Sequence, residues 1–186
     1  MDSFLFPLVA VFLASLGGHD QLLVARFSAV SGQSRGLLAA VLLSCAISAG
    51  AMAWAGATIA ALLPGAAQSM LIGFALLVAA VELFWPVRMK IPSEPTRSLG
   101  AFSLVLLTRQ IGDAARFAIF AFAAATALAP MAGLGGAIGG AAALYFGWSM
   151  GERLEHVLRL RSIRLMLGGV MLVLAVAIML GARGIL

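Results

Sequence analysis

Charged residues interrupt an apolar part of the chain in the sequence RQIGDAAR, residues 109–116. A charged side chain at the centre of a bilayer costs roughly 2.5–3.5 kcal/mol on insertion scales. On a continuous helix, Asp113 lies four residues after Arg109 and three before Arg116, so it can pair with both on one face. We therefore expect an ion-paired triplet on a face that lines a cavity. The alternative is an internal ion-pair network that only fixes helix packing.

A second polar group lies in the sequence SLGGHDQLL, residues 15–23, about 95 residues before the first. His19 belongs to the residue type that changes charge within a physiological pH range, which suits a proton carrier. A buried histidine whose hydrogen bonds are satisfied is the alternative. Asp20 is the stronger candidate for a functional carboxylate, because Arg26 is the only cation near it in the sequence.

The composition predicts that these polar groups lie inside a membrane. The chain has 186 residues, of which 63% are hydrophobic and 10% charged, whereas soluble domains carry about 25% charged residues. Residues 36–81 and 117–151 contain no charge, and each stretch exceeds the roughly 20 residues that one crossing needs. Each has a proline near its middle, so we interpret each as two crossings. A polytopic all-α membrane protein is therefore expected.

Six transmembrane helices are predicted, near residues 4–29, 36–62, 67–87, 98–127, 131–151 and 165–183. The polar connector divides them into a first three-helix repeat, residues 1–90, a cytoplasmic connector, 91–97, and a second repeat, 98–186. Three crossings per half make the second half enter the membrane in the opposite sense. This is the inverted-repeat plan of many secondary transporters, which bind their substrate near the midplane.

Basic residues predict the orientation of the chain in the membrane. They concentrate at the odd-numbered connectors, and short connectors rich in Lys and Arg stay in the cytoplasm. The residues concerned are Arg26, Arg35, Arg88, Lys90, Arg97, Arg153, Arg159, Arg161 and Arg164. Both termini are then expected on the outer side of a bacterial-type inner (plasma) membrane. This distribution also explains the net charge of +5 without a nucleic-acid partner.

Other residues that stand out in the sequence are expected to have structural roles. Glu82 precedes Trp85 and is interpreted as an interfacial carboxylate, and residues 152–164 as an amphipathic connector at the cytoplasmic surface. Cys45 is expected to be a buried small apolar residue. Glycine pairs four residues apart allow close helix packing; they are Gly135/Gly139, Gly136/Gly140 and Gly147/Gly151. No nucleophile–base pair, zinc-ligand spacing or phosphate-binding loop occurs, so neither enzymatic activity nor a cofactor is expected.

The two polar segments resemble the paired motif E-x-G-D-(K/R)-(T/S) of the cation/proton exchanger family of bacteria, chloroplasts and the Golgi. In the second half, Gln110 takes the place of the glutamate, while Gly112 and Asp113 match the motif. In the first half, Ser15 replaces the glutamate and Gly17 matches. Asp20 follows two residues after the aspartate position, which Gly18 occupies.

This resemblance implies two three-helix repeats and exchange of manganese or calcium for protons across the bilayer. It implies an ion site whose residues are Asp20, Asp113, Gln110, Gln21 and Ser15. His19 is the candidate proton carrier, and Arg109 and Arg116 are the expected counter-cations of Asp113. Two alternatives stay open: a transporter of an anionic or zwitterionic solute that uses Arg109 or Arg116, and a non-transporting membrane scaffold. A homo-oligomer also stays open.

Overall fold

The computed structural model describes residues 1–86, 98–126, 128–151, 153–154 and 160–185, and no β-strand occurs in these ranges. The first half contains α1 (Asp2–Ser15), α2 (His19–Ser31), α3 (Arg35–Ala61) and α4 (Gly65–Phe84). The second half contains α5 (Leu99–Ile111), α6 (Ala114–Ala125), α7 (Ala129–Met150) and α9 (Leu160–Ala182). The predicted all-α class is confirmed for the described chain.

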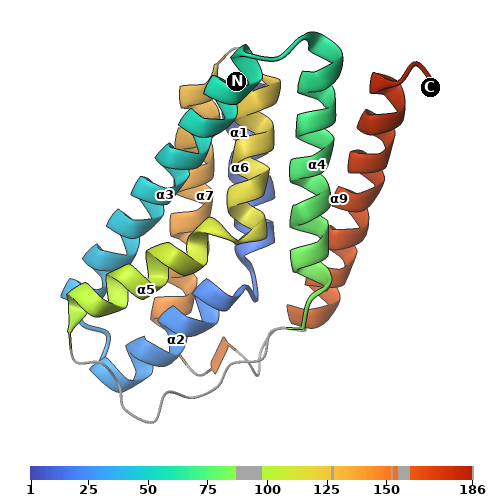
Figure 1. The fold of residues 1–186 in the computed structure, drawn as a ribbon. Helices are drawn as coiled ribbons and strands as arrows, with labels where there is room; N and C mark the ends of the chain where they lie inside the picture. The colour runs from blue at the N-terminus through green and yellow to red at the C-terminus, as the bar shows by residue number, and fades with distance from the viewer. Residues whose placement is uncertain (87–97, 127, 152, 155–159, 186) are drawn as a thin grey trace.

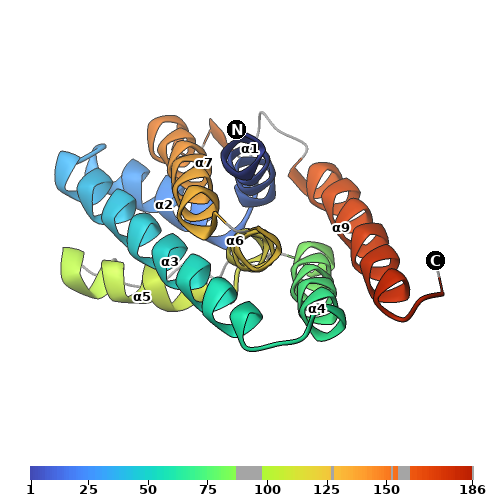
Figure 2. The same ribbon diagram turned by 90° about the horizontal axis from the view of Figure 1, so that it is seen from above.

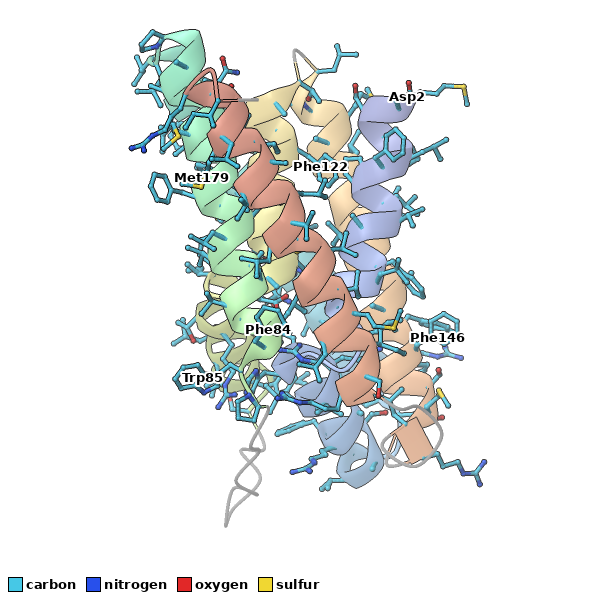
Figure 3. The ribbon with its side chains drawn as sticks, turned by 90° about the vertical axis from the view of Figure 1, so that its right-hand side faces the viewer. Asp2, Phe84, Trp85, Phe122, Phe146 and Met179 are labelled. Atoms are coloured by element: carbon cyan, nitrogen blue, oxygen red, sulfur yellow. The ribbon has the colours of Figure 1, made fainter. Side chains whose placement is uncertain are left out.

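Four of the described helices are long and apolar enough to cross a membrane: α3, α4, α7 and α9. The bent pair of α1 and α2 passes the same test when it is taken as one span, which gives up to five. Helices α5 and α6 are apolar but have only 13 and 12 residues. Large apolar side chains project outward from the helices (Figure 3). These features identify a multi-pass membrane protein.

The expectation of one continuous helix over residues 4–29 is wrong. Helix α1 ends at Ser15 and α2 begins at His19, with a bend of 63° between them. Gly17 has a φ of +70°, a conformation that glycine adopts without steric cost, and Gly18 is extended. These two glycines therefore break the helix immediately before the polar segment.

A second break replaces the expected continuous helix over residues 98–127. Helix α5 ends at Ile111, and Asp113 is extended, with φ −84° and ψ 143°, as the N-cap residue of α6. Asp113 therefore does not lie on a common helical face with Arg109 and Arg116. The two breaks are about 95 residues apart in the sequence, as the two polar segments are.

Helix α6 lies at the centre of the bundle and contacts α1, α3, α4 and α7 (Figure 2). Helix α9 packs mainly on α4, at the edge of the molecule. Helices α2 and α5 lie across one end of the bundle, and both termini lie at the opposite end (Figure 1). The two helix breaks therefore lie on the side of α2 and α5, where α4 also ends.

Glycines in α7 allow the closest helix contacts. A Cβ at Gly135 or Gly139 would collide with the backbone of α1, at the carbonyl groups of Phe4 and Leu8. A Cβ at Gly136 would collide with the side chain of Ile119 in α6. The predicted role of these glycines in helix packing is confirmed, and this packing holds α1 and α6 beside α7.

Candidate functional site

A cavity of about 400 Å³ lies between the two helix breaks and the end of α4. It is lined by His19, Asp20, Val78, Val81, Glu82, Trp85, Arg109, Gly112 and Asp113. The polar lining comes from the first turn of α2, the last turn of α4 and the α5–α6 break. Segments from both halves of the chain thus build one site.

Asp20 and Asp113 are the carboxylates that the sequence predicted, and both line this cavity. They are 5% and 7% exposed, and neither side chain has a hydrogen bond or an ion pair in the part of the chain that the structure describes. Asp20 lies in the first turn of α2, and Asp113 is the N-cap residue of α6. The positive end of each helix dipole favours a negative charge there. Two carboxylates without partners therefore face the same space.

Glu82 is a third carboxylate of the cavity, a role that its interpretation as an interfacial residue did not include. Its side chain is only 17% exposed, and its Oε1 lies 3.1 Å from Arg164 Nη2 and 3.6 Å from His19 Nδ1. Trp85, three residues later, is 67% exposed at the end of α4 (Figure 3), where aromatic residues mark membrane interfaces. Glu82 points inward because it lies on the face of α4 that packs against α9.

Arg164 was assigned to the cytoplasmic surface, and it is instead 2% exposed. Helix α9 begins at Leu160 rather than near residue 165, so Arg164 lies inside its first turns. Of the rest of the predicted connector, residues 152 and 155–159 lie outside the described residues, and residues 160–163 form the start of α9. The sequence feature that was missed is that Arg164 directly precedes the apolar residues 165–182 and belongs to the same helix.

The predicted pairing of Asp113 with two arginines is wrong. No ion pair joins Asp113 to Arg109 or Arg116, because the α5–α6 break places the two arginines on different helices. Arg109 is exposed and lines the cavity. Arg116 is 1% exposed and lies outside the cavity lining; its Nε donates to Ser48 Oγ at 3.0 Å and its Nη2 to Cys45 Sγ at 3.4 Å.

The three neutral ligands that the resemblance implied also lie outside the cavity lining. Gln21 accepts from Gly17 N at 2.8 Å and donates to Ala143 O at 2.7 Å, so it joins α2 to α7. Gln110 Oε1 accepts from Ser48 Oγ at 2.7 Å. The Oγ of Ser15 is buried and has no partner among the described residues.

Of the eight predicted site residues, the structure thus brings four together around the cavity: His19, Asp20, Arg109 and Asp113. Ser15, Gln21, Gln110 and Arg116 are absent from the lining. No three His, Cys, Asp or Glu side chains converge as metal ligands within the described ranges. The arrangement can offer two free carboxylates and one arginine to a solute.

Comparison with protein-family models, with curated proteins and with solved structures found no match.

Proposed function

We propose that this protein is a secondary transporter that carries a cation through the cavity between the two helix breaks. The observation that carries the proposal is that Asp20 and Asp113, one from each half of the chain, line one cavity without a partner among the described residues. Intramembrane charges of this kind mark substrate or ion pathways. The sequence resemblance makes manganese or calcium, exchanged for protons, the proposed substrates.

The charge of the cavity favours a cation. Asp20, Glu82 and Asp113 contribute three carboxylates to the lining, against the single guanidinium of Arg109. Arg164 compensates Glu82 and leaves Asp20 and Asp113 for the solute. Hard divalent cations bind oxygen ligands and keep water where the protein supplies few of them. A volume of about 400 Å³ has room for such a partly hydrated ion.

Two pairs of helix contacts support an arrangement of the chain as two inverted repeats, whereas the contact of α4 with α6 has no comparable counterpart between α9 and α2 among the described residues. If α1–α2 corresponds to α5–α6 and α3 to α7, the contact of α1 with α7 corresponds to that of α5 with α3. The contact of α2 with α7 likewise corresponds to that of α6 with α3. On this proposal α5 and α6 together form a sixth crossing, broken at its middle as the first one is, and the site lies where the two breaks meet.

The upright helices α1 and α6 pack in the bundle, whereas α2 and α5 lie across its end (Figure 1). We propose that this difference represents a state in which the cavity is accessible from the side of the basic connectors, the cytoplasm of a bacterial-type cell. In a Cys45→Ser background, a single cysteine at Ser93 should react with a membrane-impermeant reagent only from the cytoplasmic side, and one at Ala66 only from outside. Labelling of both from the same side would contradict this orientation.

Uptake into liposomes that contain the purified protein tests the transport function. Manganese or calcium should accumulate, and a proton gradient should change the rate. Absence of flux for every cation tested, with correctly inserted protein, would reject the proposal and favour the membrane scaffold.

A second candidate function is transport of an anionic or zwitterionic solute. Arg109 lines the cavity and makes no ion pair within the described residues. Pockets of about 300–1,000 Å³ bind organic molecules, and the cavity lies in this range. Solute flux that Arg109→Gln abolishes and that cations do not compete with would favour this candidate.

A further inference from the structure

Glu82 differs from the other two carboxylates of the cavity because an arginine holds it. We propose that Arg164 is a specificity-determining residue: it neutralises Glu82 and so restricts the cation site to Asp20 and Asp113. This inference rests on the proposed cation transport. It states that Arg164 sets the affinity of the site for its ion.

The contacts of Arg164 fix both the side chain and the backbone of Glu82. Its Nη2 donates to Glu82 Oε1 at 3.1 Å and to the Glu82 carbonyl oxygen at 3.0 Å. That carbonyl belongs to the last turn of α4 and also accepts from Trp85 N at 3.1 Å. A cation at the C-terminal end of a helix is favoured by the helix dipole. Arg164 therefore binds Glu82, which lines the cavity, although Arg164 is not itself a lining residue.

A second acidic residue, Asp113, lies near the remaining donors of Arg164. Its Nε and Nη1 are buried and have no partner among the described residues. A Cβ placed at Gly18 would lie 3.7 Å from Nη1 and 3.8 Å from Asp113 Oδ1. Arg164 Nη1 and Asp113 Oδ1 are thus both close to the position of this Cβ. If Glu82 released Arg164, Asp113 would be an unpaired carboxylate near the guanidinium.

Arg164 is the one permanently charged partner of Glu82 among the described residues. His19 Nδ1 lies 3.6 Å from the same carboxylate oxygen, within ion-pair distance, but the imidazole carries a charge only when it is protonated. Asp20 and Asp113 are acidic, and Arg109 makes no ion pair with Glu82. Without Arg164, Glu82 would keep only the titratable His19 as an ion-pair partner among the described residues and would face the cation as a third carboxylate.

This inference predicts opposite effects for the two partners of the ion pair. We expect Arg164→Gln to lower the KM for manganese uptake by about tenfold, because a nearby charge in a partly buried site attracts the ion strongly. Its Vmax should fall as well, since the ion leaves more slowly. Glu82→Gln should raise the KM, because it frees Arg164 to compete for Asp113. The double variant should return the KM to within about threefold of the wild type.

The experiment is manganese uptake into proteoliposomes, with monodispersity of each variant as the control for folding. A purely structural role for Arg164 would lower Vmax in all three variants without opposite shifts in KM, and that result would overturn the inference. If Arg164→Gln does not yield monodisperse protein, Glu82→Gln decides the question, since an unchanged KM contradicts competition by Arg164. Absence of uptake by the wild type would instead reject the proposed function.

Discussion

Replacing Asp113 with asparagine strongly reduces manganese or calcium uptake into proteoliposomes while the protein stays folded. The substitution keeps the size of the side chain and removes the charge. Since the Asp113 carboxylate makes no hydrogen bond or ion pair among the described residues, little of the fold depends on that charge. Contacts with charged groups contribute about 1.5–3 kcal/mol, so the affinity for the ion should fall by about 10- to 150-fold. Asp20→Asn should have a similar effect.

Asp2→Asn is the matched control, because Asp2 lies in the first turn of α1, away from the cavity and at the end of the molecule that carries the termini (Figure 3). It should transport at the wild-type rate. Unchanged uptake by both Asp113→Asn and Asp20→Asn would show that the cation does not use the cavity. Loss of uptake together with aggregation would indicate a structural role for these carboxylates.

Replacing Gly139 with leucine prevents normal assembly of the bundle. A Cβ at this position already collides with the backbone of α1 at the Leu8 carbonyl, and backbone cannot move aside as a flexible side chain can. Overpacking of a core costs about 1–3 kcal/mol where side chains give way, so the loss should reach or exceed the top of this range. The thermal midpoint of the purified protein in detergent should fall sharply, or monodisperse protein should not be obtained.

Gly169→Leu provides the control for this packing prediction. Gly169 lies in the middle of α9, and a Cβ there meets no atom within 4 Å. The substitution adds the same apolar side chain to a membrane helix, so its thermal midpoint should stay close to that of the wild type. Equal stability of the two variants would contradict the close contact between α1 and α7.

The membrane class and most of the long helices could be predicted from the sequence, because charge-free stretches reflect the solvent around them. Residues 36–81 carry no charge and contain most of α3 and α4, which are separated near Pro64. The helix breaks were not predicted, although they depend on local features. Gly17 and Gly18 allow a left-handed and an extended backbone at the first break, and Gly112 precedes the extended Asp113 at the second.

The candidate site was predicted in part. Asp20, Asp113, His19 and Arg109 could be identified because polar residues in apolar segments are conspicuous. Glu82 and Arg164 could not, because each lies near the end of its helix, where charged residues usually reach the interface. Their pairing depends on the contact between α4 and α9, which are about 80 residues apart in the chain. Arg116 was misassigned because its helix was expected to continue α5.

The most direct test of the shared site is the binding of Mn²⁺ to the protein in nanodiscs. Binding is measured as the loss of the paramagnetic resonance signal of the free ion. One saturable site per chain is expected for the wild type, with competition by Ca²⁺. The Asp20→Asn/Asp113→Asn double variant should lose this binding, and Asp2→Asn should retain it. Binding by the double variant that equals that of the wild type would contradict a cation site formed by the two helix breaks.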